Sequence, residues 1–385
     1  MQRKKGIIVS FFNSGNMGDL LICQQMKAMA ERYWDTYCVD FSTTRIVSDV
    51  QQISTNTVNS AIRKYIKKCI NCIIPNRSLI TYLKIMKTIP RIYSDLLKDD
   101  SINLLIIGGG NMLMDTTIFP CYISKVYYAL RTAKKHNKKT ALICTGAGPI
   151  RNRFQLWYMK RALELCDFVS VRDIYSADLL NEICPDKEIE VWYDPAMSVD
   201  GKISHKSKSI GICVFFGTDK KRFEVVRQAY KNLILKLKQR FLEYRIVLFA
   251  SEISDYSHVD MICTEFENGE IDVKRISTVQ ELLNIYGEID VLISARMHGM
   301  ITSLVRRTPV IGIGWQKKFE GLAEHFDMKD RLFKIENIEY QIDDIVNKVD
   351  SILADLDNEN KMIDEKMIFV ADRINSDFDK FAERI

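Results

Sequence analysis

The sequence predicts an α/β protein made of two doubly wound domains, and three observations lead to this prediction. Short, apolar, β-branched runs alternate with longer amphipathic segments, which is typical of βαβ units with mostly parallel sheets. This alternation stops at the polar, basic residues 198–209 and then begins again. At 385 residues, the chain is long enough for two domains of about 100–200 residues.

Six apolar runs predict the strands of the N-terminal domain, which we place at residues 1–200. The runs are "GIIVSFF" (6–12), "TYCVDF" (36–41), "NLLIIGGG" (103–110), "TALICTG" (140–146), "FVSVRD" (168–173) and "EIEVWYD" (188–194). Residues 44–100 are rich in lysine and have only weak strand character. We therefore expect them to form a helical insertion on this domain.

Four further runs predict the strands of a C-terminal domain at residues 208–338. They are "IGICVFF" (210–216), "YRIVLFA" (244–250), "IDVLISA" (289–295) and "PVIGIGW" (309–315). Residues 339–385 have the pattern of one or two amphipathic helices without another strand. Such C-terminal helices can pack back on the first domain.

Composition indicates a globular protein, with 47% hydrophobic and 27% charged residues. The net charge of +5 is mild and spread along the chain, which suits a small anionic substrate or a phospholipid surface. Because no basic stripe is visible, we expect no nucleic-acid partner.

The ten cysteines are mostly single and in apolar company, as expected in a reducing cytoplasm. Cys69 and Cys72 have the spacing of half a zinc site or a redox pair, but no second pair accompanies them, so we favour a packing role. The apolar run at the N-terminus is shorter than a signal peptide needs, and no run is long enough to span a bilayer. We expect a cytoplasmic protein whose membrane contact is peripheral.

Polar residues at the carboxyl ends of strands are the candidate site, because helix N-termini attract anions there and ligands bind between paired doubly wound domains. "NSGNMGDLLI" (13–22) follows the first strand and lacks the glycine pattern of a dinucleotide fingerprint. Asn16 and Asp19 lie in its turn. Asp19 fits a plain helix N-cap as well as a substrate-binding or base role.

Three more strand ends carry candidate residues. Gly108, Gly109 and Gly110 precede Asn111, and we favour a ligand-lining loop over a merely tight turn there. Arg172 ends the "FVSVRD" strand, where a surface ion pair is an equally good interpretation. Asp194, before Pro195, is expected to set the turn towards the second domain.

"SARMHG" (294–299) places Arg296 and His298 between a buried strand and the start of a helix. Histidine ordinarily has a pKa of about 6.5 and exchanges protons near neutrality, while arginine is a fixed cation. Proton transfer to a bound anion is therefore feasible at this position. Lys317 or Lys318, after the next strand, could reach the same anion.

Taken in order, "GNMGD", "GGG", "SVRD", "YDPA", "SARMHG" and a lysine about twenty residues later resemble the polysaccharide pyruvyl transferase family. The resemblance spans residues 7 to 330, although residues 44–100 have no counterpart that we can align. It implies a GT-B-like fold, with two Rossmann-type doubly wound domains facing a cleft and C-terminal helices. It also implies transfer of a pyruvyl group from phosphoenolpyruvate to a sugar, giving a cyclic ketal and phosphate.

Carried over by position, the resemblance implies that Arg172, Arg296 and Lys318 bind phosphoenolpyruvate and that His298 is the acid that protonates its methylene carbon. Lys317 is an equal candidate for the lysine. The acceptor is expected against the first domain near Asn16, Asp19 and the loop of Gly109, Gly110 and Asn111, with Asp19 as base for the attacking hydroxyl.

The resemblance further implies a lipid-linked glycan acceptor at the inner membrane face, in the synthesis of a bacterial capsule or exopolysaccharide. It implies no metal and no organic cofactor. Two alternatives stay open. One is a GT-B glycosyltransferase that uses a nucleotide sugar, although the acidic pattern expected to hold its ribose is missing after residue 315. The other is a non-catalytic member of the family.

Overall fold

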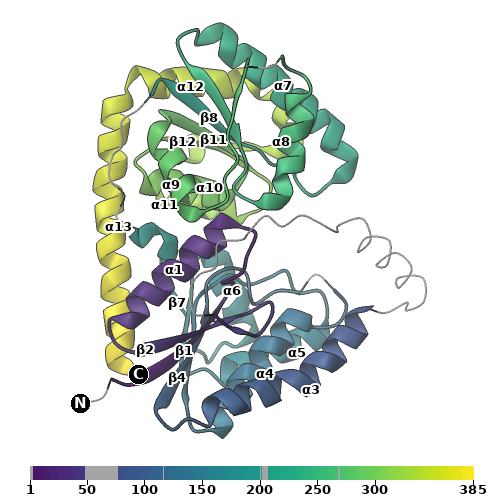
Figure 1. The fold of residues 1–385 in the computed structure, drawn as a ribbon, viewed down its shortest axis with the longest axis vertical. Helices are drawn as coiled ribbons and strands as arrows, with labels where there is room; N and C mark the ends of the chain where they lie inside the picture. The colour runs from purple at the N-terminus through teal and green to yellow at the C-terminus, as the bar shows by residue number, and fades with distance from the viewer. Residues whose placement is uncertain (1–2, 48–76, 116, 200, 202–206, 268) are drawn as a thin grey trace. The chain divides into compact units, whose positions relative to one another are not determined.

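The structure, a computed structural model, describes residues 3–385 apart from 48–76, 116, 200, 202–206 and 268. The cysteine pair at Cys69 and Cys72 lies outside the described residues. The chain divides into two compact units, shown in Figure 1. The first unit contains Met1–Asn13, Met26–Asp194 and Asp377–Ile385; the second contains Ser14–Gln25 and Pro195–Ser376.

The first unit is built on a seven-stranded sheet in the order β3-β2-β1-β4-β5-β6-β7. Its strands are β1 (Lys5–Ser10), β2 (Asp35–Asp40), β3 (Ile46–Val47), β4 (Ile102–Gly108), β5 (Lys139–Thr145), β6 (Phe168–Val171) and β7 (Glu190–Val191). The pairs are parallel except β2 with β3. Because β1 lies between β2 and β4, the winding direction reverses there, as in a Rossmann sheet.

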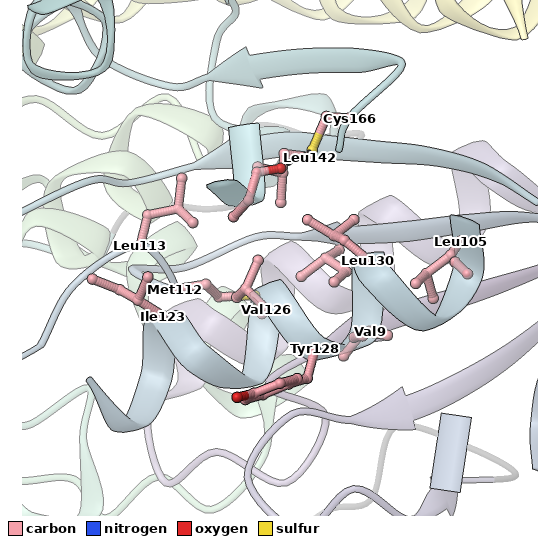
Figure 2. Close-up of a cluster of buried hydrophobic side chains, with 14 of the residues drawn as sticks. Val9, Leu105, Met112, Leu113, Ile123, Val126, Tyr128, Leu130, Leu142 and Cys166 are labelled. Carbon is pink, nitrogen blue, oxygen red and sulfur yellow. Dashed lines mark hydrogen bonds between the residues drawn. The ribbon is translucent and has the colours of Figure 1, made fainter. Parts of the chain in front are cut away.

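Helices follow the strands of this sheet as a βαβ pattern requires. They are α1 (Met17–Glu31), α3 (Arg77–Leu97), α4 (Cys121–Lys135), α5 (Arg153–Glu164) and α6 (Ile174–Ile183). Helices α3, α4 and α5 lie side by side as one layer (Figure 1). Figure 2 shows the core beneath this layer, where Leu105 and Leu142 of the sheet meet Val126 and Leu130 of α4. Full burial of each such side chain contributes about 1.5–3 kcal/mol.

Helix α3 corrects the expectation of an insertion for the described part of residues 44–100. It lies directly before β4 in the chain, and Tyr82, Ile85 and Ile89 of α3 are buried in the same core as α4 and α5. The Tyr158 hydroxyl contacts that of Tyr82 at 2.7 Å. Residues 77–97 therefore form a crossover helix of the fold, because their apolar stripe covers the sheet.

The second unit is built on a six-stranded sheet in the order β10-β9-β8-β11-β12-β13. Its strands, all paired in parallel, are β8 (Ser209–Cys213), β9 (Arg245–Phe249), β10 (Asp272–Val273), β11 (Val291–Ser294), β12 (Val310–Gly314) and β13 (Leu332–Lys334). Its helices are α7 (Phe223–Arg240), α8 (Tyr256–Cys263), α9 (Val279–Glu288), α10 (Met297–Val305), α11 (Lys318–His325) and α12 (Ile342–Ala354). Winding reverses between β8 and β11, as it does between β1 and β4.

Every predicted strand is present within a few residues of its predicted position, so the α/β, doubly wound class is confirmed for both units. The predicted strand at 188–194 is reduced to the two residues of β7. The sequence patterns missed β3, β10 and β13, each two or three residues long and at a sheet edge. Such short edge strands carry too few residues to show a period. No helix among the described residues is long and apolar enough to cross a membrane.

The long helix α13 (Leu356–Arg384) belongs to the second unit up to Ser376 and to the first unit from Asp377. Its last turns pack on the first sheet through aromatic rings. The centre of the Phe381 ring lies 4.9 Å from the centre of the Phe168 ring and 5.9 Å from the centre of the Trp34 ring. This packing accounts for the place of the C-terminal residues in the first unit.

We predict that Phe381→Ala destabilises the first unit by about 3–5 kcal/mol, because Phe381 is fully buried and its loss leaves a cavity. The matched control is Phe369→Ala on the same helix, since Phe369 is 57% exposed. Urea unfolding followed by tryptophan fluorescence measures both. Equal unfolding midpoints for the two variants would contradict the packing described.

Candidate functional site

The reversal point of the second sheet brings the candidate residues of the second unit together. In an open doubly wound sheet, ligands bind outside the carboxyl ends of the strands where the order reverses. Here those strands are β8 and β11. Phe215 follows β8, and Arg296 and His298 follow β11. This edge of the sheet is therefore the candidate site of the second unit.

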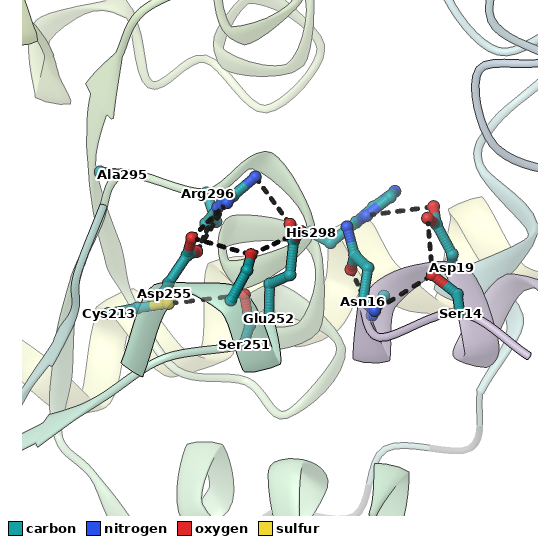
Figure 3. Close-up of polar contacts among 12 residues, drawn as sticks. Ser14, Asn16, Asp19, Cys213, Ser251, Glu252, Asp255, Ala295, Arg296 and His298 are labelled. Carbon is teal, nitrogen blue, oxygen red and sulfur yellow. Dashed lines mark hydrogen bonds and ion pairs between the residues drawn. The ribbon is translucent and has the colours of Figure 1, made fainter. Parts of the chain in front are cut away.

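Arg296 is held by two carboxylates (Figure 3). Its Nε and Nη2 each donate to Asp255 at 2.7 Å, and its Nη1 lies 3.0 Å from Glu252. The guanidinium also lies over the Phe215 ring, 3.9 Å from its centre. Burial opposes the charge, yet the hydrogen bonds with Asp255 and the charge of Glu252 outweigh it and raise the pKa of Arg296. An anion binding to Arg296 would therefore have to compete with Glu252.

The turn before α1 is attached to the end of β9. The Met17 amide donates to the Ser251 carbonyl, and the Ile253 amide donates to the Gly15 carbonyl, both at 3.0 Å. Asn16 pairs with Glu252 between these two bonds. Residues 14–25 therefore belong to the second unit, which corrects the predicted boundary of the first domain at 1–200.

Asn16 and Asp19 have different roles in that turn. The Asn16 side chain accepts a hydrogen bond from the Gly18 amide at 2.9 Å and so caps α1. Asp19 lies with its Oδ1 at 3.9 Å from Nδ1 of His298, and its other oxygen accepts from the Ser14 hydroxyl at 3.3 Å. The separation of Asp19 and His298 is too long for a direct hydrogen bond but short enough for electrostatic contact. Figure 3 shows the two side chains pointing toward one another.

Gly18 makes this approach possible. A Cβ at position 18 would lie 2.2 Å from the Cβ of His298 and 2.4 Å from its Nδ1, so any other residue would force His298 away. Glycine is required at position 18 because its backbone packs closely against the His298 side chain.

The two candidate lysines differ in their surroundings. Lys318 is the first residue of α11, is partly buried and has its Nζ 5.8 Å from the centre of the Trp315 ring. The Trp315 indole donates to the carbonyl of Ala295, directly before Arg296, at 3.0 Å. Lys317 is exposed. Lys318 is thus the lysine linked to the β11 edge through packing.

Arg172 lies in the first unit and is already paired. Its Nη1 donates to Asp194 at 2.7 Å, with both side chains only 4% exposed, and its Nη2 donates to the Asn111 side chain at 3.1 Å. This excludes the surface ion pair considered from the sequence. Asp194, which is the last residue of its stretch before the second unit resumes at Pro195, is thus also the partner of Arg172. Whether Arg172 acts together with Arg296 and His298 stays a prediction.

The glycine loop after β4 has a backbone reason for its composition. Gly109 and Gly110 have φ of 73° and 74°, the left-handed region that favours glycine. The Gly110 carbonyl accepts from the Gly146 amide at 2.9 Å. This conformation aims Asn111 at Arg172. The loop is therefore explained as a tight turn, and ligand contact by Gly109, Gly110 and Asn111 stays a prediction.

Three residues of the second-unit site were not identified from the sequence: Glu252, Asp255 and His258. All follow β9 in "SEISDYSH" (251–258), a strand end that carries the same kind of polar signal as the others. The His258 ring stacks on Phe216, with centres 4.4 Å apart. Burial, assisted by the charge of Arg296, lowers the pKa of His258 and so favours its neutral imidazole.

Asp115 is a buried carboxyl of the first unit that the sequence also did not reveal. It is 3% exposed and accepts from the amides of Tyr122 at 3.1 Å and Ile123 at 3.2 Å, at the start of α4. Burial raises its pKa to about 6, although these two bonds favour the carboxylate. Among the described residues, no group of three or more His, Cys, Asp or Glu side chains could hold a metal ion.

Comparisons with known proteins agree with this architecture. The family model described as polysaccharide pyruvyl transferase matches residues 16–317. No curated protein sequence gave a significant match.

Several solved structures share the fold at low sequence identity. S. aureus MnaA, solved with UDP, has a TM-score of 0.57 at 11% identity, covering 100% of this chain and 98% of its own. UDP-GlcNAc 2-epimerase from Neisseria meningitidis, bound to UDP-GlcNAc, has a TM-score of 0.55 at 10% identity, covering 99% of this chain and 100% of its own. An alpha-glucosyltransferase in complex with UDP and DNA has a TM-score of 0.51 at 10% identity, covering 95% of each chain. This chain therefore has a GT-B-like fold.

We predict that Asp255→Asn lowers the free energy of unfolding of the second unit by about 3 kcal/mol, because it removes a partner of a buried ion pair. The control is Asp260→Asn, on the next turn of the chain, whose ion pair with Arg275 is exposed and contributes little. Urea denaturation compares the variants. Equal effects would show that Asp255 does not hold Arg296 in solution.

We also predict a pH dependence from Asp115. Its pKa is about 6 in the folded chain against an ordinary 3.8, so the folded state binds the extra proton between these values. The contribution of Asp115 to the free energy of unfolding is therefore fully present below pH 4. It falls by ~3 kcal/mol as the pH rises through the folded-state pKa of about 6. Asp115→Asn should remove this dependence. Unfolding free energies of both proteins from pH 4 to pH 7 measure it, and a constant difference between them would contradict it.

Proposed function

Because the chain belongs to the polysaccharide pyruvyl transferase family, we propose that it transfers a pyruvyl group from phosphoenolpyruvate to a sugar, forming a cyclic ketal and releasing phosphate. The observation that carries this proposal is the placement of His298 beside Asp19, in the first turn of α10, next to the fixed cation Arg296. A proton donor at an anion-attracting helix start is what the first step of this reaction needs.

Charge at the site suits phosphoenolpyruvate, which carries roughly three negative charges near neutrality and needs several cations to offset its desolvation. In our proposal Lys318 and the N-termini of α10 and α11 bind its phosphate and carboxylate. Arg296 contributes by exchanging Glu252, the more exposed of its two carboxylates, for the substrate. Arg172 enters the proposal through the family resemblance alone, because its guanidinium already pairs with Asp194.

The proposed reaction balances without an added reagent. His298 donates a proton to the methylene carbon, which leaves an oxocarbenium-like centre at the adjacent carbon. A sugar hydroxyl attacks that centre and gives its proton to Asp19. A second hydroxyl then replaces the phosphate, which leaves with that hydroxyl's proton, and the ketal closes. General acid catalysis of this kind contributes about 10²–10⁴ in rate. The proposal includes no metal ion and no organic cofactor.

We place the acceptor against the first unit, at the carboxyl ends of β1 and β4, near Gly109, Gly110 and Asn111. The glycan would be lipid-linked and presented at the inner face of a bacterial membrane, as in capsule or exopolysaccharide synthesis. This placement follows the rule that ligands bind where the strand order reverses.

A second candidate is a GT-B glycosyltransferase that uses a nucleotide sugar. The observation that favours it is the fold, shared with proteins whose structures contain UDP or UDP-GlcNAc. The family match over residues 16–317 ranks this candidate below pyruvyl transfer. A third candidate is a family member without activity.

One assay separates the three candidates. Purified protein is incubated with candidate glycans and either phosphoenolpyruvate or a set of nucleotide sugars. Phosphate release, together with an acceptor mass gain of pyruvate minus water, supports the pyruvyl transfer. Nucleotide release with a mass gain of one sugar residue would replace it with the glycosyltransferase. Phosphoenolpyruvate binding without turnover on any glycan would favour the inactive member.

We predict that His298→Ala lowers the turnover rate by about 10²-fold or more, while phosphoenolpyruvate still binds. The control is His136→Ala, a histidine of the first unit that contacts the Ser94 hydroxyl at 3.0 Å. It should keep normal turnover. Single-turnover kinetics and calorimetric binding measure the two effects. Normal turnover by His298→Ala would refute its role as acid.

A further inference from the structure

The excess of positive over negative charge in this protein is concentrated in one layer of the first unit. Helices α3, α4 and α5 contain eleven Lys or Arg residues and two Asp or Glu residues, a net +9. The whole chain carries +5, so everything outside these helices carries −4. Because the three helices lie side by side over one face of the sheet, their charges act as one field.

Exposed apolar side chains lie in the same layer. On α3, Ile80 and Leu83 are 47% and 53% exposed; on α5, Phe154 and Trp157 are 41% and 47% exposed; and Ile118, just before α4, is 70% exposed. Basic residues flank them along α3 and α5. The exposed basic residues of the layer are Arg77, Lys84, Lys87, Arg91, Arg131, Lys135, Arg153, Lys160 and Arg161.

These apolar residues are joined into one patch at one end of the layer. Tyr82 of α3 contacts Phe154 of α5 at 5.5 Å and Phe119 at 5.9 Å between ring centres. The Asn152 side chain donates to the Ile118 carbonyl at 2.9 Å. The patch lies at the N-terminal ends of the helices, and in a βαβ unit those ends adjoin the carboxyl ends of the strands. It therefore borders the edge where we place the acceptor.

We propose that this patch, defined as Ile80, Leu83, Ile118, Phe154 and Trp157 with the surrounding basic residues, docks on an anionic lipid membrane. Exposed apolar patches on soluble surfaces mark interaction sites. Trp and Phe insert at the headgroup level of a bilayer, while Lys and Arg extend their charges toward lipid phosphates.

A second copy of the chain is a poorer occupant, because two layers of +9 would face each other. A polynucleotide would use the charge but would leave Ile80, Leu83 and Ile118 exposed to water. A membrane uses both kinds of side chain. It would also bring a lipid-linked glycan to the carboxyl edge of the first sheet. The inference rests on the proposed function only for this last advantage.

Vesicle co-sedimentation of the full-length protein tests the proposal without phosphoenolpyruvate or acceptor. Wild-type protein should bind vesicles of phosphatidylcholine with phosphatidylglycerol, should bind phosphatidylcholine alone much more weakly, and should be released by salt. Each basic residue removed should weaken binding about fivefold. Lys84→Glu with Lys87→Glu should therefore weaken it at least ~25-fold, and Leu83→Glu with Trp157→Glu should also reduce it strongly.

The controls carry changes of the same kinds in the second unit: the double charge reversal Lys220→Glu with Lys221→Glu, and the single apolar change Leu242→Glu, where Leu242 is 86% exposed. They should bind as wild type does. All variants should keep the wild-type circular dichroism and should turn over a water-soluble acceptor normally.

Three outcomes would overturn the proposal: no binding of wild type to anionic vesicles, equal loss in patch and control variants, or binding to polynucleotide but not to lipid. Concentration-dependent dimers that the patch variants abolish, with vesicle binding intact, would assign the patch to a second copy and overturn it too. Pyruvyl transfer to a soluble acceptor without vesicle binding would refute only the membrane patch. Vesicle binding without pyruvyl transfer would refute only the proposed function.

Discussion

The close approach of Gly18 to His298 is the constraint on which the second-unit site depends. There is no space for a Cβ at position 18, so the start of α1 and the start of α10 are packed in direct contact. That contact places Asp19 next to the imidazole. The same turn pairs with the end of β9, and β9 leads into Glu252 and Asp255, which hold Arg296. One tight contact thus joins the candidate acid, its carboxylate neighbour and the fixed cation.

Both candidate arginines are held by carboxylates in this structure. Arg172 pairs with Asp194 deep in the first unit, and Arg296 pairs with Asp255 and Glu252 in the second. Buried ion pairs of this kind gain little net stability, because the desolvation of both charges offsets their attraction. They do fix the position of each guanidinium. An arginine already paired with a carboxylate binds an incoming anion by exchange, which makes Glu252 a determinant of how strongly Arg296 attracts a substrate.

The net charge of the whole chain does not reveal how charge is distributed over the folded protein. A net +5 spread along the sequence predicts a mildly basic surface. In the fold, however, the basic residues of α3, α4 and α5 lie together, and the acidic excess lies elsewhere. Segments 77–97 and 153–164 are far apart in sequence and become neighbours of α4 only because the sheet order puts their strands beside one another.

Local patterns were sufficient for the fold class, the ten predicted strands and the strand-end positions of Asn16, Asp19, Arg296 and His298, because hydrophobic period and turn residues depend on neighbours in the chain. Short edge strands such as β13, the crossover role of α3 and the partners of the arginines were not accessible in this way. Arg296 and Asp255 are 41 residues apart, and Arg172 and Asn111 are 61 apart. Such pairs form only when strand order and helix packing bring distant strand ends to one edge, and no periodicity along the chain encodes that order.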